Sequence, residues 1–278
     1  MTPICGLEQV TKKYKATVLD EVTVGFESGK LHAIVGRNGV GKSTLLSLLA
    51  GTLRPTSGSV TAFGEKVFDN ASVMSRICCA GIDVPYPGMW SVRSILSIAE
   101  RRWPHFSSAR ADELLRAFDL DLKKRYGKLS RGQKSMVGIV VALASMTELT
   151  LLDEPYLGLD VNNRELFYKF LREEVERGGR TFIVATHHLE ESAGLMDTFT
   201  VLGRDGRVRL HADAAELEDA YVYVTAGTLA PIDGETERSE IAGVTRVLAP
   251  ADAAARISGP RVFPAPLEQT LAALVRES

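Results

Sequence analysis

The chain has 278 residues, 45% of them hydrophobic, so it can bury a full core in one large domain or in one domain with a small appendage. Its 33 lysines and arginines and 35 aspartates and glutamates give a net charge of -2, which excludes a general electrostatic attraction to a polyanion such as nucleic acid. Three cysteines, Cys5, Cys78 and Cys79, predict buried reduced thiols in a cytosolic protein rather than a disulfide framework.

No stretch has the pattern of a membrane span or a secretion signal. The longest nearly unbroken apolar run, Met136–Met146, is too short to cross a bilayer, and the N-terminus lacks a basic segment followed by an apolar run. We therefore expect a soluble chain that is not secreted. If it works at a membrane, another polypeptide must do the spanning.

The first segment predicts an antiparallel β layer. Two short extended runs, Leu7–Val10 and Val22–Phe26, are separated by polar turns. Tyr14 stands in the turn between them. Its spacing alone favours an ordinary edge aromatic over a functional residue.

A glycine-rich segment follows the apolar run Leu31–Val35 and precedes a leucine-rich run at 45–50. It has the form G-x-x-x-x-G-K-[ST] and consists of Gly36, Arg37, Asn38, Gly39, Val40, Gly41, Lys42, Ser43 and Thr44. Glycines allow positive φ and close backbone approach, so successive N–H groups can point at an anion, and the helix that follows adds the positive end of its dipole.

This pattern predicts a phosphate-binding P-loop. Lys42 would reach the β- and γ-phosphates of a nucleotide, and the Ser43 hydroxyl would bind Mg²⁺. The alternative is a glycine-rich turn before a core helix. We favour the phosphate site because the strand before and the helix after are the context that a P-loop requires.

Helical patterns dominate residues 85–146. Amphipathic spacing is present at 91–99 and at Ser108–Leu120, and a long apolar helix ending near Met146 follows Leu129–Gln133. Ser130 and Gln133 have the spacing of a capping box, which leaves N–H groups at a helix start where an anion can bind. By itself this spacing predicts only a helix start, because such caps are common.

Two further apolar strands end in polar side chains. Leu149–Leu152 leads into Asp153 and Glu154, and buried carboxylates are costly unless a cation or a reacting group pairs with them. Thr181–Ala185 leads to His187, for which the alternatives are a histidine at a helix N-terminus and a lone metal ligand. Then two strands flank Arg204-Asp205-Gly206, which predicts a hairpin over 198–211.

The composition changes at Ala212. Five of the eleven prolines lie beyond it, with strand candidates at 220–225 and 244–248 and a closing helix after Pro266. We therefore expect a main domain over 1–211, with a helical insertion at about 85–146, and a small α+β appendage over 212–278.

The order of these motifs resembles that of the ATPase subunit of ATP-binding cassette (ABC) transporters, over roughly residues 5–211. The resemblance identifies Gly36–Thr44 as Walker A, Leu149–Glu154 as Walker B, Leu129–Gln133 as the signature and 158–160 as the D-loop. It implies an α/β fold: a P-loop NTPase core with a mixed sheet, an antiparallel β subdomain and a helical subdomain, to which the C-terminal α+β appendage is added.

The resemblance also implies ATP and Mg²⁺ as cofactors and a role for each candidate residue. Glu154 would polarise the attacking water, while His187 and Lys42 would contact the reacting phosphates. Mg²⁺ would be held by Ser43 and Asp153. The nucleotide would be bound by Tyr14, stacked on adenine, by the P-loop residues Gly36, Asn38, Gly39, Gly41, Lys42, Ser43 and Thr44, and by the signature residues Ser130, Gly132 and Gln133 of a facing subunit.

Two positions depart from the family pattern. Arg131 replaces the usual signature glycine, and no glutamine lies between Gln9 and Gln133 to serve the Q-loop. Alignment of the Q-loop points to Ile82 or Asp83, of which only Asp83 is polar.

The expected function is ATP hydrolysis that powers a separate membrane permease, by analogy an exporter, at the cytoplasmic face of the membrane. The resemblance implies a second ATPase subunit that completes an ATP-sandwiched dimer, and no nucleic-acid partner is expected. The alternatives are a nucleotide-dependent clamp acting on nucleic acid or ribosomes and a degenerate nucleotide-binding regulator.

Overall fold

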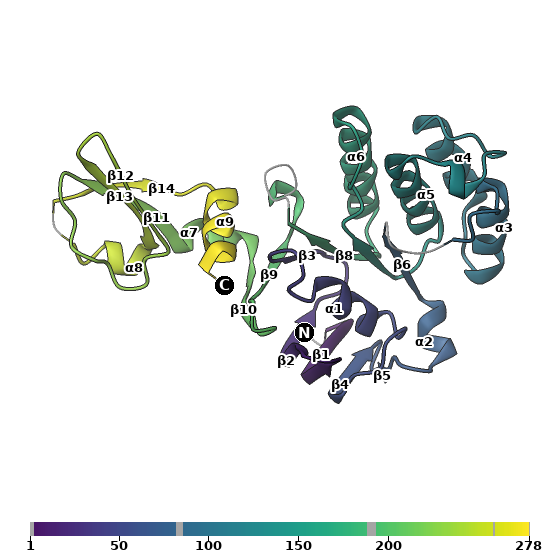
Figure 1. The fold of residues 1–278 in the computed structure, drawn as a ribbon, viewed down its shortest axis with the longest axis horizontal. Coiled ribbons are helices and arrows are strands. Elements are labelled where there is room, and N and C mark those ends of the chain that lie inside the picture. The colour runs from purple at the N-terminus through teal and green to yellow at the C-terminus, as the bar shows by residue number, and fades with distance from the viewer. Residues whose placement is uncertain (1–2, 82–85, 188–192, 258, 278) are drawn as a thin grey trace.

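The centre of the computed structural model is a six-stranded mixed sheet (Figure 1). The structure describes residues 3–81, 86–187, 193–257 and 259–277. The sheet order is β10 (Val208–Asp213), β9 (Thr198–Leu202), β3 (Leu31–Val35), β8 (Thr181–Thr186), β7 (Leu149–Asp153) and β6 (Ile77–Gly81). All neighbours are parallel except β9 and β10, which form the expected hairpin. The middle strands β3 and β8 are buried along their whole length because both faces of the sheet are covered.

One face of the sheet is covered by α1 (Lys42–Leu49) and by a second, antiparallel sheet. This second sheet has the order β2 (Thr17–Phe26), β1 (Cys5–Lys13), β4 (Ser57–Ala62) and β5 (Glu65–Lys66). The four leucines of α1 are buried between the two sheets. The antiparallel layer predicted before the P-loop is confirmed, with longer strands than the sequence indicated.

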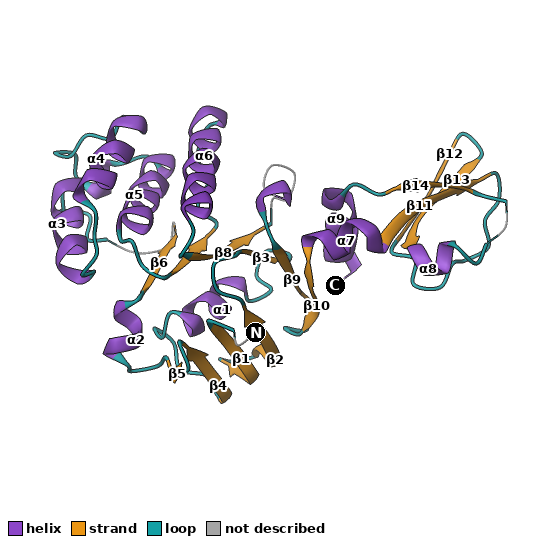
Figure 2. Ribbon diagram, turned by 180° about the vertical axis from the view of Figure 1, so that it is seen from behind, coloured by secondary structure: helices purple, strands orange, loops and turns teal. Residues whose placement is uncertain are grey.

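The other face carries helices that stand together at one end of the molecule (Figure 2). They are α3 (Val92–Arg102), α4 (Ser108–Ala117), α5 (Arg131–Ala144) and α6 (Val161–Arg177), with the short α2 (Ala71–Ser75) beside β6 and 3-10 turns at Tyr126–Lys128 and Ala193–Leu195. Helix α5 ends at Ala144, near Met146 as predicted, and Met146 has a φ of 51°, which α-helix does not allow. No helix in the described ranges combines the length and apolar character that a membrane span needs.

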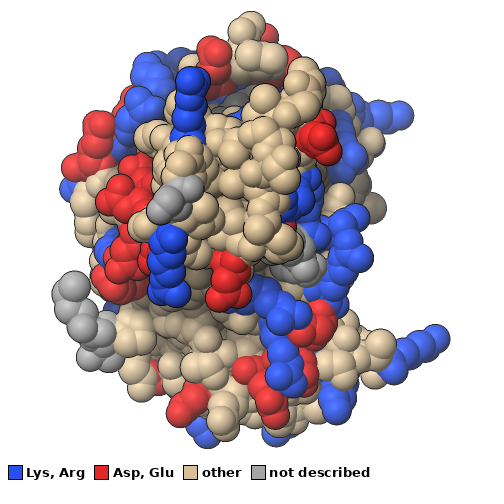
Figure 3. Space-filling view, turned by 90° about the vertical axis from the view of Figure 1, so that its left-hand side faces the viewer, with Lys and Arg blue, Asp and Glu red and all other residues tan. Residues whose placement is uncertain are grey.

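The C-terminal residues form a third sheet, in the order β12 (Glu237–Ile241), β13 (Val244–Pro250), β11 (Tyr221–Ala226) and β14 (Arg261–Pro264), with α8 (Ala251–Ala254) on one face. Seen from this end, acidic and basic side chains are interspersed (Figure 3). Helices α7 (Ala214–Ala220) and α9 (Leu267–Glu277) lie between this sheet and the six-stranded sheet (Figure 1).

Three leucines beyond residue 211 pack in the main core. Leu217 of α7 and Leu267 and Leu271 of α9 belong to the same buried cluster as Phe199 and Val201 of β9. The division at residue 211 stays a prediction. These contacts mean that α7 and α9 stabilise the six-stranded sheet as well as the appendage.

The three cysteines are free thiols in the structure. Cys5 and Cys78 are buried, and burial raises the pKa of Cys78 to about 12. Such thiols are protonated and unreactive at neutral pH, as the sequence predicted for structural cysteines.

Candidate active site

The P-loop connects the carboxyl end of β3 to the first residue of α1, Lys42. Gly41 precedes the helix with a φ of +113°, and a Cβ atom there would lie 2.9 Å from Leu19 and 3.1 Å from the carbonyl oxygen of Val18. Only glycine allows both this backbone conformation and this close approach of β2. The motif glycine therefore lets the loop curl against the antiparallel sheet.

Lys42 lies folded back into this loop. Its ammonium group donates to the carbonyls of Gly36 at 2.9 Å and Arg37 at 3.2 Å, and its side chain is 6% exposed. Burial lowers the pKa of Lys42, and the negative charges of Glu154 and Asp153 oppose that shift. The structure thus places one partly desolvated cation among the carbonyls of the loop, next to the carboxylates that end β7.

Glu154 directly follows β7 in an unusual backbone conformation, with a φ of 45°. Its N–H donates to the carbonyl of Ala185 on β8 at 3.0 Å, which fixes the turn after the strand. Its Oε1 atom lies 2.7 Å from Nδ1 of His187 and 3.5 Å from Nζ of Lys42. A strained backbone at a buried carboxylate of this kind is frequent at functional sites, because the surrounding structure must hold it there.

Tyr156 contacts the second carboxylate oxygen of Glu154. Its hydroxyl donates to Oε2 of Glu154 at 3.1 Å, and the residue is 3% exposed. Tyr156 belongs to none of the motifs that the sequence shows. The available signal was its place just past Pro155, where the chain leaves the strand end that carries the two carboxylates.

Ser43 and Asp153 are the predicted Mg²⁺ ligands. Ser43 is exposed in the first turn of α1, and Asp153 ends β7, beside Ala185 of the neighbouring strand. A hydroxyl and a carboxylate are hard oxygen donors, and Mg²⁺ keeps several waters and binds phosphate oxygens besides one or two protein ligands. The described residues hold no cluster of three or more His, Cys, Asp or Glu side chains that would suit a metal cage. The donor set therefore fits an ion shared with a nucleotide.

Tyr14 lies on the hairpin between β1 and β2 and is 60% exposed. The ammonium group of Lys12 is 5.0 Å from the centre of its ring. Because β2 continues from this hairpin to the contact with Gly41, the ring lies on the strand pair that adjoins the P-loop. An exposed aromatic face in this position is available for stacking.

The signature residues form the predicted capping box. The Ser130 hydroxyl accepts from the N–H of Gln133, and the Gln133 side chain accepts from the N–H of Ser130 and from Lys124. Within the part of the chain that the structure describes, no hydrogen bond or ion pair joins Ser130 or Gln133 to Lys42 or Glu154. The fold therefore brings together Walker A, Walker B and His187, and leaves the signature as a separate helix start.

A crevice of about 560 Å³ opens beside this site. Val35, Gly36 and His187 line it from the edge of the six-stranded sheet, and Tyr223, Arg246 and Arg276 are among the residues that line it from the appendage. The appendage thus reaches the edge of the P-loop. The Q-loop candidates Ile82 and Asp83 lie outside the described residues.

A family model described as ABC transporter matches residues 19–157, which include Walker A, the signature and Walker B. The chain belongs to the ABC transporter family. It is the ATPase domain of that family, the ATP-binding subunit of transporters, and its mixed sheet, antiparallel sheet and helical layer are those of the family's P-loop NTPase fold.

Curated relatives of this ABC ATPase include proteins of different transporters. It is 36% identical to the cobalt import ATP-binding protein CbiO of Rhodobacter capsulatus, over 84% of this chain and 87% of that protein. It is 31% identical to the bacitracin transport ATP-binding protein BcrA of Bacillus licheniformis, over 71% of this chain and 66% of that protein. It is 26% identical to the ABC transporter ATP-binding protein YtrB of Bacillus subtilis, over 78% of this chain and 75% of that protein.

Solved structures agree with this assignment. The ATP-binding subunit of an ABC transporter superposes with a TM-score of 0.68 at 25% identity, covering 77% of this chain and 92% of that one. The cbiO1 protein of Clostridium perfringens, part of the transporter complex cbiONQ, superposes with a TM-score of 0.62 at 27% identity, covering 78% of this chain and 91% of that one. Both likenesses leave about a fifth of this ABC ATPase uncovered.

Proposed function

We propose that this ABC ATPase hydrolyses Mg-ATP to drive a separate membrane permease, and that it does so as a dimer with ATP held between two subunits. The observation that carries the proposal is the cluster of Lys42, Glu154 and His187, in which one carboxylate oxygen lies 3.5 Å from the lysine and 2.7 Å from the histidine. Phosphoryl transfer needs a cation at the phosphates and an acceptor for the water, and this cluster supplies both.

In this mechanism Lys42 leaves the carbonyls of its own loop and turns to the β- and γ-phosphates. Glu154 accepts a hydrogen bond from the attacking water, and the hydroxyl of Tyr156 holds the carboxylate in place. His187 donates from Nδ1 to Glu154, which orients its ring so that the other nitrogen can face the γ-phosphate. Ser43 and Asp153 would hold Mg²⁺, which neutralises charge on the phosphates when it is bound.

The nucleotide site is incomplete without a second subunit. Ser130 and Gly132 start α5 with N–H groups suited to a phosphate, yet no described contact joins that helix start to the chain's own Lys42 or Glu154. We propose that they cap the γ-phosphate bound by a second copy of this chain or by a related chain, with Gln133 fixing the cap and Tyr14 stacking on adenine.

The permease would dock beside α3, on the segment from 86 to 105. Met89 is 77% exposed and Ile98 of α3 is 44% exposed, so apolar side chains face solvent on this part of the helical layer. Two glycines, Gly88 and Gly127, pack backbone to backbone and hold the loop before α3 in place. A rigid loop with exposed apolar groups suits an inserted helix of a membrane partner.

We propose export as the direction of transport and the cytoplasmic face of the membrane as the site of action. The relatives include an import protein for cobalt and a transport protein for bacitracin, and the proposal of export follows the second of these. Uptake or loss of substrate by inside-out vesicles that contain the permease measures it directly.

The test is purification of the tagged chain from membranes. We expect a multi-spanning protein to copurify, and ATPase activity of the complex to disappear in the Glu154→Gln variant. Purification without any membrane protein, together with unchanged hydrolysis in the variant, would contradict both parts of the proposal.

A further inference from the structure

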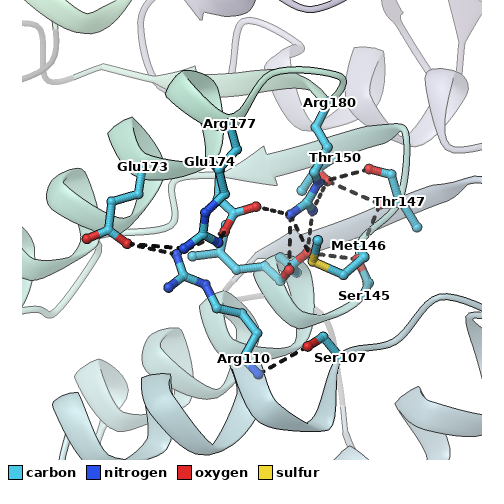
Figure 4. A network of polar contacts seen from close by, with 12 residues as sticks. Ser107, Arg110, Ser145, Met146, Thr147, Thr150, Glu173, Glu174, Arg177 and Arg180 are labelled. Carbon is cyan, nitrogen blue, oxygen red and sulfur yellow. Dashed lines mark hydrogen bonds and ion pairs between the residues drawn. The ribbon is translucent and has the colours of Figure 1, made fainter.

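The carboxyl end of the signature helix α5 is held by one buried arginine, Arg180 (Figure 4). Its side chain is 8% exposed, and its contacts account for all five N–H groups of the guanidinium. These N–H groups donate, at distances from 2.6 to 3.1 Å, to the hydroxyl of Thr150 and the carboxylate of Glu174. They also donate to three backbone carbonyls, those of Ala142, Leu143 and Thr147.

Four of these acceptors belong to three different elements, and the fifth, Thr147, lies in the loop between α5 and β7. Ala142 and Leu143 lie in the last turn of α5, Thr150 lies on β7, and Glu174 lies on α6. The last carbonyls of a helix have no partner within the helix, so a cation there satisfies them and complements the dipole. Arg180 thus ties the end of α5 to the strand that carries Asp153 and Glu154.

Glu174 joins this arginine to the helical layer. It is 1% exposed, and its carboxylate pairs with Arg180 at 2.6 Å, with Arg110 of α4 at 2.9 Å and with Arg177 at 2.9 Å (Figure 4). Buried ion pairs contribute little net stability, because desolvation offsets the attraction, but they fix geometry sharply. The network therefore sets the position of α4 and α5 relative to α6 and β7.

The amino end of α5 is fixed as well. The Ser135 hydroxyl donates to the carbonyl of Leu157 at 2.7 Å, and a Cβ atom at Gly132 would overlap the carbonyl oxygen of Gly158. Helix α5 has 14 residues. It is thus a rod of about 21 Å that is held at both ends.

We propose that Arg180 and Glu174 are positioning residues for the composite ATP site: by fixing the carboxyl end of α5, they set where Ser130 and Gly132 meet the nucleotide of the partner subunit. This role rests on the dimer proposed above. It acts on the partner's site rather than on the chain's own. Arg180 lies just before β8 and His187 just after it, so the six residues of this strand, about 20 Å, separate Arg180 from His187.

Lysine is the diagnostic replacement for Arg180. It keeps the positive charge beside Glu174, but its ammonium presents three donors from one atom and cannot reach acceptors on three elements at once. Arg180→Lys therefore removes the rigid attachment of α5 and leaves the charge balance of the network unchanged.

The experiment uses mixed dimers with two different affinity tags. One chain carries Lys42→Ala and supplies only a signature, and the other carries Ser130→Arg and supplies only a nucleotide site, so one composite site remains. We then place Arg180→Lys in either chain and measure ATPase turnover, ATP affinity and the melting temperature of each mixed dimer.

We expect about a tenfold loss of turnover when Arg180→Lys is in the signature-supplying chain, and less than about a twofold loss when it is in the other chain, because a displaced helix misplaces the groups that contact the phosphate. ATP affinity of the nucleotide-supplying chain should not change. The control is Arg76→Lys, which breaks the two hydrogen bonds between Arg76 and the exposed Glu148 and does not touch α5.

A purely structural role lowers turnover equally in both placements, and that result, or no loss in either, overturns the inference. If Arg180→Lys does not fold, Thr150→Val removes one of the five acceptors without changing shape, and the same asymmetry decides. Inactive mixed dimers that lack any Arg180 substitution would overturn the composite site itself, and the role of Arg180 with it.

Discussion

Oε1 of Glu154 lies 2.7 Å from Nδ1 of His187 and accepts its hydrogen bond, although 33 positions separate the two residues in the chain. The contact exists because β7 and β8 are parallel neighbours, with Asp153 paired to Ala185, so their carboxyl ends open at the same edge of the sheet. This relationship joins the end of β7 and His187 into one unit beside Lys42.

Lys42→Ala should abolish hydrolysis and weaken ATP binding by about a hundredfold, because the loop loses the ammonium aimed at the phosphates. Isothermal titration with ATP and a phosphate-release assay measure the two effects. Lys169→Ala, on the exposed face of α6, is the matched loss of a lysine and should behave like the unsubstituted chain. Unchanged binding in the first variant would remove the P-loop assignment.

Glu154→Gln should bind Mg-ATP and accumulate as an ATP-dependent dimer, because an amide keeps the shape of the side chain but activates water poorly. Adding Ser130→Arg should abolish that dimer while the monomer still binds ATP. Light scattering after size-exclusion chromatography, with and without Mg-ATP, checks both. A dimer that survives the second substitution would argue against a signature acting on the facing site.

Tyr156→Phe should lower kcat by about threefold to tenfold and leave the KM for ATP unchanged. The variant removes one hydrogen bond to Oε2 of Glu154, which is typically worth about 0.5–1.5 kcal/mol, without creating a cavity. Steady-state kinetics separates the two constants. A change in KM alone would place the tyrosine in nucleotide binding instead.

Leu271→Ala should lower the free energy of unfolding by about 2–5 kcal/mol, because this side chain of α9 is fully buried in the core cluster of the six-stranded sheet. Val262→Ala is the control in the same appendage, and its side chain is 49% exposed, so its cost should stay within about 0.5 kcal/mol. Urea unfolding of both variants gives the comparison. Equal costs would show that α9 does not support the main core.

Stability should fall as the pH drops below about 6.5, partly through His32. This histidine is buried, and burial lowers its pKa from 6.5. Its Nε2 donates to the carbonyl of Glu27 at 2.9 Å, and its Nδ1 accepts from Thr198 at 2.6 Å. Below that pH the unfolded chain takes up a proton that the folded chain resists. The free energy of unfolding between pH 5 and 7 should depend less on pH in the His32→Gln variant. If it depends on pH as in the unsubstituted chain, the effect comes from other groups, such as His211.

The sequence alone predicted the parts of the site that depend on neighbours along the chain. The P-loop glycines, the capping box of Ser130 and Gln133, and the carboxylates that end β7 are local features, because backbone freedom, helix caps and strand ends act over a few residues. The motif order also fixed the family, since several independent motifs occur in the expected sequence.

Only the tertiary structure showed which side chains meet. Arg180 at the end of α5 and Leu271 against β9 join distant segments by packing, and the sequence does not say which segment each of them contacts. The hydroxyl of Tyr156 meets Glu154 only because of the turn that follows β7. A buried arginine looks like any surface arginine in a sequence, because its charge says nothing about its surroundings. Its five acceptors come from three elements and the loop between α5 and β7, so the role of Arg180 emerges only once the chain has folded.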